Sequence, residues 1–253
     1  MIYNGDCLDI MPTLADKSVD MILCDLPYQT TACKWDTIIP FEPLWAQYKR
    51  LIKDNGAIVL TASQPFTSAL VMSNPGWFKY EWIWMKDRGT NFLNGKIQPL
   101  RNHENILVFY GKQPTFNRQF TKGNPSHSIG KANGKIAIGV TTGNFTRINA
   151  DLEGTDKNPK TVLQFPVPHP PIHPTQKPVA LFEYLIKTYT NEGETVLDNC
   201  AGSFTTAIAC MNTNRKYICI EKDDKYFEIG KNRIANHQPF HQPDKMATGC
   251  RSS

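Results

Sequence analysis

Short apolar segments alternate with segments of helical periodicity along most of this 253-residue chain, and this alternation constrains the fold more than any other feature. The apolar segments are predicted strands near residues 1–3, 20–24, 57–61, 81–85, 105–110, 195–197 and 217–220. Helices are predicted near residues 8–14, 43–52, 65–72, 179–190, 205–212 and 225–235. Alternating strands and helices are typical of an α/β fold with a doubly wound, mostly parallel sheet.

The sequence Asp25-Leu26-Pro27-Tyr28 follows directly after one of these apolar strands. Pro27 restricts Leu26 to an extended conformation and has no N–H, which leaves the backbone carbonyls of the turn free beside the Asp25 carboxylate. Two acceptors and an aromatic ring fit the exocyclic amine of a nucleobase, and open α/β sheets bind their ligands at strand ends. The alternative is a plain turn with a core tyrosine.

A second strand end, within residues 194–206, combines a carboxylate, a turn of small residues and a following helical segment. Gly202 lets a ligand approach this turn closely, and the N–H groups at the start of the helix lie beside it. About twenty residues later another strand ends in Glu221, where an acidic residue holds ribose hydroxyls in nucleotide-binding βαβ units. The pattern favours a nucleotide-binding unit over a purely structural loop.

The order of several motifs resembles that of one known family. They are Gly5-Asp6-Cys7, Asp25-Leu-Pro-Tyr28, Arg101-Asn-His-Glu104, His173-Pro-Thr-Gln-Lys-Pro178 and Asp198-Asn-Cys-Ala-Gly-Ser-Phe-Thr-Thr206. The chain resembles, over about residues 1–115 and 165–235, the amino-group DNA methyltransferases that use S-adenosylmethionine, in the permuted order called the beta class. The resemblance implies a Rossmann-like methyltransferase fold with an inserted target-recognition region.

The resemblance also implies roles for individual residues. In the catalytic turn, formed by Asp25, Leu26, Pro27 and Tyr28, the target amine would donate to the Asp25 carboxylate and the Leu26 carbonyl. Tyr28 would stack on the base after it leaves the duplex. The residues expected to bind S-adenosylmethionine are Asp6, Cys7, Asp25, His173, Thr175, Lys177, Asp198, Ala201, Gly202, Ser203, Phe204, Glu221 and Lys222.

Three departures from the family pattern lie in these motifs. Leu26 replaces the first proline of the catalytic turn, but Pro27 still keeps Leu26 extended, so we expect its carbonyl to remain an acceptor. Asn199 and Cys200 replace Pro-Phe in the cofactor loop. Phe204 replaces the last glycine of that loop, where a side chain could crowd the ligand unless its ring fills the space left at position 200.

Positive charge is concentrated in the middle of the chain. Residues 78–147 hold eleven basic and three acidic side chains, a net charge of +8, whereas the whole chain carries only +5. Interleaved aromatic and amide side chains fit contacts with the phosphates and bases of double-stranded DNA, and a solvated loop without a partner is the alternative. The residues expected to bind DNA are Lys86, Arg88, Lys96, Arg101, Arg118, Lys122, Lys131 and Lys135.

The Gly- and Asn-rich stretch at 111–164 lacks strong periodicity. A loop of this length inside a compact domain is uncommon unless it is functional, so we expect it to recognise the target. The predicted organisation is a catalytic half at 1–110, a target-recognition region at 111–164, a cofactor-binding half at 165–237 and a disordered tail at 238–253.

Composition and short patterns argue against several other classes of protein. No apolar run reaches the roughly 18 residues that span a bilayer, and the first residues lack a signal peptide, so we expect a cytoplasmic protein without a membrane partner. Seven cysteines without a C-x-x-C pair favour reduced core residues over disulfides or zinc ligands. Pro170 and Pro171 exclude a helix that would align His169 with His173, so no metal site is expected.

These observations predict an enzyme that methylates N6 of adenine in duplex DNA after base flipping. The Asp form of the catalytic turn is commoner among the adenine enzymes of the family, whereas the cytosine enzymes often carry Ser. Cytosine-N4 methylation is the nearest alternative, followed by an RNA or protein amide methyltransferase and by a DNA-binding homologue impaired through Leu26 and Phe204. A homodimer and a cognate restriction enzyme are left open as partners.

Overall fold

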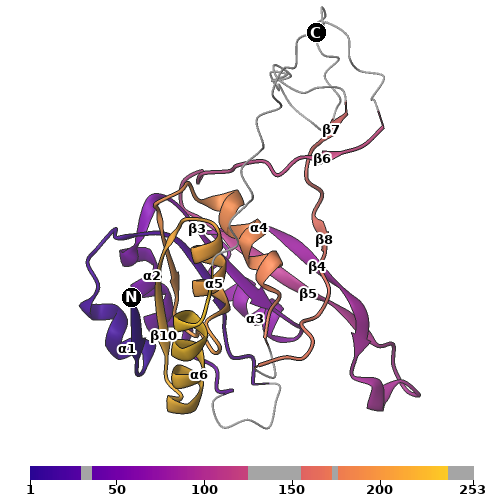
Figure 1. The fold of residues 1–253 in the computed structure, drawn as a ribbon, viewed down its shortest axis with the longest axis horizontal. Helices are drawn as coiled ribbons and strands as arrows, with labels where there is room; N and C mark the ends of the chain where they lie inside the picture. The colour runs from indigo at the N-terminus through magenta and orange to yellow at the C-terminus, as the bar shows by residue number, and fades with distance from the viewer. Residues whose placement is uncertain (30–35, 125–154, 173–175, 239–253) are drawn as a thin grey trace, which may run out of the picture. The chain divides into compact units, whose positions relative to one another are not determined.

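A computed structural model of the chain describes residues 1–29, 36–124, 155–172 and 176–238. Its main element is an eight-stranded sheet with the order β1-β10-β9-β2-β3-β5-β4-β8 (Figure 1). The strands are β1 (Ile2–Asn4), β2 (Val19–Asp25), β3 (Ile52–Ala62), β4 (Phe78–Thr90), β5 (Arg101–Phe109), β8 (Val162–Gln164), β9 (Thr195–Asp198) and β10 (Lys216–Glu221).

Most neighbouring strands of this sheet are parallel. Parallel pairing runs from β1 through β10, β9 and β2 to β3, whereas β5 is antiparallel to both β3 and β4. The apolar sequence of β2 is typical of a parallel strand that is covered on both faces. The expected α/β fold with a mostly parallel sheet is therefore confirmed.

Helices cover both faces of the sheet. On one face, Ile22 and Cys24 of β2 belong to a core cluster with α1 (Cys7–Ile10), α2 (Phe41–Leu51) and α3 (Phe66–Ser73). On the other face, Met21 and Leu23 belong to a cluster with α4 (Val179–Tyr189) and α5 (Thr205–Asn212). A smaller cluster joins β10 and α5 to α6 (Asp224–Ala235). No helix in the described ranges is long and apolar enough to cross a membrane.

The strand order reverses between β9 and β2, which are neighbours in the sheet although they are distant in the sequence. Met21 pairs with Val196, and β3 then continues the sheet on one side while β10 continues it on the other. The carboxyl ends of β2 and β9 thus place Asp25 and Asp198 at the same edge. Open α/β sheets bind ligands at such a switch point.

The predicted elements differ from the structure mainly at their ends. The helix expected at 8–14 divides into α1 and a 3-10 turn at Met11–Thr13, because Pro12 cannot donate a backbone hydrogen bond. The stretch expected to lack regular structure at 111–164 contains β6 (Thr121–Lys122), β7 (Asp156–Lys157) and the edge strand β8.

Contacts between Cα atoms divide the chain into two compact units. One comprises Met1–Asn117 with Thr161–Ser253 and contains the sheet, and the other comprises Arg118–Lys160. In the second unit β6 and β7 pair antiparallel, and Lys122 Nζ lies 2.5 Å from Asp156 Oδ1. The functional boundaries given above stay a prediction.

Candidate active site

The Asp25 carboxylate, at the end of β2, is held in place by three side chains. Its Oδ2 atom accepts a 2.6 Å hydrogen bond from Lys177 Nζ. Its Oδ1 atom lies 2.5 Å from the Tyr28 hydroxyl and also accepts a hydrogen bond from Thr61 on the neighbouring strand β3. The Asp25 side chain is still 19% exposed, so a ligand can reach an oxygen whose orientation the protein already fixes.

Tyr28 packs against the wall of the site beside Asp25. Its ring stacks on Phe66, with ring centroids 5.1 Å apart and an interplanar angle of 28°. Burial raises the pKa of the Tyr28 hydroxyl well above its ordinary value, and the Asp25 carboxylate raises it further. The hydroxyl therefore remains protonated at neutral pH, while stacking of Tyr28 on a target base stays a prediction.

Two lysines and two carboxylates form a network of alternating charge at this end of the site. Glu104 lies between Lys177, at 3.3 Å, and Lys86, at 2.6 Å. Burial raises the pKa of Glu104, but the two ammonium groups outweigh this effect and hold it below its ordinary value. Burial also disfavours the charged form of Lys177, yet Asp25 and Glu104 raise its pKa above the ordinary value.

This network gives two of the predicted residues partners that the sequence does not show. The ammonium of Lys177, expected beside the cofactor, bonds to the Asp25 carboxylate, and its role toward the cofactor stays a prediction. Lys86, expected to contact DNA phosphates, has a side chain that is only 9% exposed and is paired with Glu104. Net charge in a sequence does not show this pairing, and a contact of Lys86 with DNA stays a prediction.

Glu221 ends β10 and binds the backbone of the loop that follows β9. Its Oε2 atom accepts a 2.7 Å hydrogen bond from the Gly202 N–H, and its Oε1 atom accepts one of 2.8 Å from the Asp223 N–H. Burial raises the pKa of Glu221 above its ordinary value, although these N–H groups oppose the shift. Each carboxylate oxygen has a second lone pair, so Glu221 can still accept hydrogen bonds from ligand hydroxyls.

Asp198 is buried at the end of β9, where it shapes the same loop. Its oxygens accept hydrogen bonds from the Cys200 N–H, at 3.1 Å, and from the Thr206 hydroxyl, at 2.5 Å. Burial raises the pKa of Asp198 to about 7, against the effect of these donors. Asp198 therefore connects the loop to the start of α5.

Two loop positions have left-handed backbone conformations, Gly202 with φ 52° and Phe204 with φ 58°. Such a conformation is easy for glycine but uncommon for phenylalanine. The Phe204 ring is fully buried against Phe227 of α6, and Gly230 allows this approach because a Cβ there would overlap the ring.

The expectation that Phe204 contacts the cofactor is corrected by this packing. Phe204 does not line the cavity and does not occupy the space at position 200, where Cys200 packs against a different core cluster.

The substituted residue Asn199 has a structural role that the sequence analysis did not foresee. The Tyr48 hydroxyl donates a 2.6 Å hydrogen bond to Asn199 Oδ1. Asn199 Nδ2 in turn lies 3.5 Å from the sulfur atoms of both Cys7 and Cys200. The amide thereby ties the loop after β9 to α1 and α2, and no motif indicates these long-range contacts.

Asp6 and Lys222 meet at the outer edge of this region. The Asp6 carboxylate caps α1 through the Leu8 N–H and accepts a 2.9 Å hydrogen bond from Lys222 Nζ. The hydrogen bond from Lys222 lowers the pKa of Asp6, because a neighbouring ammonium favours the ionised carboxylate. The Lys222 side chain is 75% exposed and so remains able to move toward a ligand.

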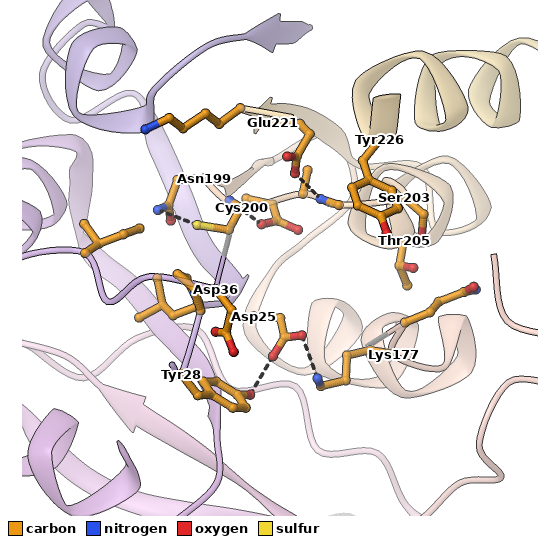
Figure 2. Close-up of a pocket in the computed structure, with 18 of the residues that line it drawn as sticks. Asp25, Tyr28, Asp36, Lys177, Asn199, Cys200, Ser203, Thr205, Glu221 and Tyr226 are labelled. Carbon is orange, nitrogen blue, oxygen red and sulfur yellow. Dashed lines mark hydrogen bonds and ion pairs between the residues drawn. The ribbon is translucent and has the colours of Figure 1, made fainter. Parts of the chain in front are cut away.

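A cavity of about 790 Å³ connects the two groups of residues. Figure 2 shows Asp25, Tyr28 and Lys177 on one side and Glu221, Ser203 and Tyr226 on the other. A cavity of this size fits an ordinary small-molecule ligand or cofactor. The expected residues that line it are Asp6, Cys7, Asp25, Leu26, Pro27, Tyr28, Lys177, Asp198, Ala201, Gly202, Ser203, Glu221 and Lys222, and those not foreseen include Asp36, Asn199, Cys200, Thr205 and Tyr226.

Of the residues expected to bind DNA, Lys86 and Arg101 also line the cavity. Arg88, Lys96 and Arg101 are exposed on or beside β4 and β5. Arg118 and Lys122 are exposed in the second unit. Four further predicted residues lie outside the described ranges, namely Lys131, Lys135, His173 and Thr175.

Comparison with known proteins decides the family. The sequence model of the N6/N4 methyltransferase family, described as DNA methylase, matches residues 19–232, which is most of the chain. The chain belongs to the DNA methylase family. The expected beta-class amino-methyltransferase membership and the expected cofactor, S-adenosylmethionine, are thereby confirmed.

Individual relatives of this DNA methylase cover most of its length. Type II methyltransferase M2.MboI of Moraxella bovis is 27% identical over 271 residues, covering 94% of this chain and 88% of the relative. DNA adenine methyltransferase YhdJ of Escherichia coli (strain K12) is 29% identical over 273 residues, covering 97% and 86%.

Solved structures have the same fold. The M1.HpyAVI–SAM complex is 25% identical with a TM-score of 0.62, covering 92% of this chain and 98% of that chain. The cytosine-N4-specific PvuII DNA methyltransferase has a TM-score of 0.64 at 15% identity, covering 92% and 85%, and shows the fold alone.

Proposed function

We propose that this DNA methylase transfers a methyl group from S-adenosylmethionine to N6 of adenine in duplex DNA, after the base has left the helix. The observation that carries the proposal is the Asp25 carboxylate, preorganised by Lys177, Tyr28 and Thr61 at one end of a cavity. The similarity to YhdJ, named a DNA adenine methyltransferase, supports adenine as the target.

The chemistry at Asp25 follows from the weak nucleophilicity of an exocyclic amine, whose lone pair is delocalised into the ring. Hydrogen bonds from the amine to Asp25 and to the Leu26 carbonyl favour the pyramidal form, in which the nitrogen lone pair is available. The cofactor supplies a methyl group that is bound to a sulfonium sulfur. After the transfer, the rest of the cofactor leaves as a neutral thioether. As the nitrogen–carbon bond forms and the sulfur–carbon bond breaks, the amine loses one proton toward the Asp25 side of the site.

The network behind Asp25 prepares it for this role. Lys177 and Tyr28 hold the carboxylate before substrate arrives, so that little reorganisation is needed when charge develops on the amine. Glu104 neutralises the excess positive charge of Lys177 and Lys86.

At the other end of the cavity, Glu221 fits the ribose hydroxyls of the cofactor, since its oxygens retain free lone pairs at the end of β10. Gly202 gives the ligand close access to the loop backbone. Asp198 acts through the loop, which it connects to α5.

We also assign DNA contacts to the exposed basic residues Arg88, Lys96, Arg101, Arg118 and Lys122, and target recognition to residues 111–164. Cations of this kind bind phosphates without regard to sequence, whereas base contacts in the recognition region would specify the site.

The test is incubation with labelled S-adenosylmethionine and genomic DNA, followed by nucleoside mass spectrometry. The expected product is N6-methyldeoxyadenosine. N4-methyldeoxycytidine as the main product would reassign the base, and label found only in RNA or protein would replace the substrate class. Cofactor binding in calorimetry without transfer to any nucleic acid would identify a catalytically impaired homologue.

A further inference from the structure

The hairpin formed by β4 and β5 ends in an exposed apolar tip. The connection between these strands includes a short 3-10 turn at Phe92–Asn94. Phe92 is 76% exposed, Leu93 is 85% exposed and Ile97 is 83% exposed. In Figure 1 the connection between β4 and β5 projects away from the helices that cover the sheet. Several large apolar side chains exposed together mark an interaction surface.

Hydrogen bonds within the tip define the path of its backbone. The Gly95 N–H donates to the Phe92 carbonyl at 3.0 Å, and the Ile97 N–H donates to the Asn94 carbonyl at 2.9 Å. The side chains of Asn91 and Asn94 are joined by a 3.0 Å hydrogen bond. These local bonds fix the backbone of the tip without burying its apolar side chains.

The surroundings of the tip are positively charged. Arg88, Lys96 and Arg101 are exposed on the hairpin, whereas Asp87 is the one acidic residue between Lys86 and Arg101 in the sequence. The Asp87 carboxylate accepts a hydrogen bond from the Val167 N–H. Cations around an apolar tip complement a polyanion, and they would repel the same tip on a second copy of the chain.

The base of the hairpin tip is continuous with the cavity. Thr90 and Arg101 pair across the β4–β5 ladder, and both residues line the cavity. Phe92 and Leu93 follow Thr90 by two and three residues, which corresponds to about 10 Å of chain at most. A duplex that delivers a base into this cavity must therefore pass beside the tip.

We propose that the hairpin tip is a DNA-intercalating wedge, in which Phe92, Leu93 and Ile97 enter the base stack next to the base that has left the helix. This proposal rests on the proposed function, because it takes duplex DNA as the substrate. Apolar side chains that insert between base steps replace lost stacking contacts, and cations beside them neutralise the adjacent phosphates. Removal of a base from the stack creates the gap that such side chains fill.

The experiment measures unwinding of DNA, which insertion into the stack causes and phosphate binding alone does not. Closed circular plasmid is relaxed by a topoisomerase in the presence of the protein, and its linking number is measured after the proteins are removed. The test variant is Phe92→Ser/Leu93→Ser/Ile97→Ser, and the control is Met72→Ser, which alters a side chain that is 72% exposed on α3. Each protein is compared at equal occupancy of DNA.

We expect the parent and Met72→Ser to change the linking number and the triple variant to lose most of this change. The triple variant should also lose at least tenfold in kcat/KM for DNA methylation, with an unchanged melting temperature and unchanged affinity for S-adenosylmethionine. Unchanged unwinding and unchanged kcat/KM in the triple variant would overturn the wedge, while the methylated nucleoside from the parent would leave the proposed function intact.

Sedimentation of the same proteins tests the alternative occupant of the tip. If the parent sediments as a dimer and the triple variant as a monomer, with equal unwinding by both, the tip joins two copies of the chain and the wedge is refuted. Failure of the parent to methylate any DNA would refute the proposed function instead, and this outcome is distinguishable because unwinding is measured without methyl transfer.

Discussion

The buried carboxylates at the two ends of the cavity, the proposed catalytic end and the proposed cofactor end, have opposite environments. At the catalytic end, Asp25 and Glu104 contact the ammonium groups of Lys177 and Lys86, and the pKa of Glu104 is held below its ordinary value. At the cofactor end, the carboxylate of Asp198 accepts from an N–H and a hydroxyl, and burial raises its pKa to about 7. Charge is compensated within the protein at the first end, whereas a cationic ligand can supply compensation at the second.

The largest effect should come from Asp25→Asn, which keeps the shape of the catalytic end but removes its acceptor charge. We expect the rate of methyl transfer to fall by about 100-fold or more, as for the loss of other preorganised electrostatic partners. Affinity for S-adenosylmethionine in calorimetry should stay within a few-fold of the parent. Asp54→Asn, which alters an exposed carboxylate paired with Lys17 and Lys112, is the matched control. A variant that retains more than a tenth of the rate would contradict the role of Asp25.

The next effect is on the free energy of unfolding, and it compares Glu104 at one end of the cavity with Glu221 at the other. Glu104→Gln leaves two buried ammonium groups undercompensated, and breaking such buried pairs typically costs about 3–5 kcal/mol of unfolding free energy. Glu221→Gln should cost much less, because the donors to Glu221 are neutral N–H groups. Chemical denaturation of both variants measures the difference. Glu104→Gln/Lys86→Met should recover part of the loss, and equal destabilisation by the two single variants would remove the contrast.

The affinity for S-adenosylmethionine should show the reverse order, with a larger loss for Glu221→Gln than for Glu104→Gln. Glu221→Gln weakens acceptance of ligand hydroxyls, and we expect it to raise the Kd for S-adenosylmethionine by roughly tenfold, which corresponds to a hydrogen bond to a charged group. Asp198→Ala should also weaken binding, because it releases the loop from α5. A folded Glu104→Gln protein should bind the cofactor within a few-fold of the parent. Normal affinity in both cofactor-end variants would remove these carboxylates from the site.

The smallest effect is the pH dependence contributed by Asp198. Because its pKa rises from an ordinary 3.8 to about 7 on folding, the folded state binds a proton that the unfolded state releases between these values. Its contribution to stability is complete below about pH 4 and is lost as the pH rises through about 7. The melting temperature of the parent, compared with that of Asp198→Asn, should therefore decline by a few degrees from pH 5 to pH 8. A constant difference across this range would contradict the raised pKa.

The sequence was sufficient to predict the strands and the loop that carry Asp25, Gly202 and Glu221, because these elements are recognised from the pattern of neighbouring residues alone. It could not predict that Lys177 bonds to Asp25, since this contact joins residues 152 positions apart. The burial of Lys86 depends on Glu104, which reaches it only after β4 and β5 pair. The orientation of the Phe204 ring, toward α6 and away from the cavity, depends on a left-handed backbone angle and on the absence of a side chain at Gly230.

The adjacency of β2 and β9 has a consequence for the synthesis of the chain. Val19–Asp25 leaves the ribosome about 170 residues before Thr195–Asp198, its neighbour in the finished sheet. At a synthesis rate of roughly 5–20 residues per second, the apolar edge of β2 waits about 10–35 s for that neighbour. An unpaired apolar strand is prone to associate with other chains during this interval. Both ends of the cavity are therefore complete only after Thr195–Asp198 and Lys216–Glu221 have been synthesised, and we expect a nascent chain to gain from chaperone protection until then.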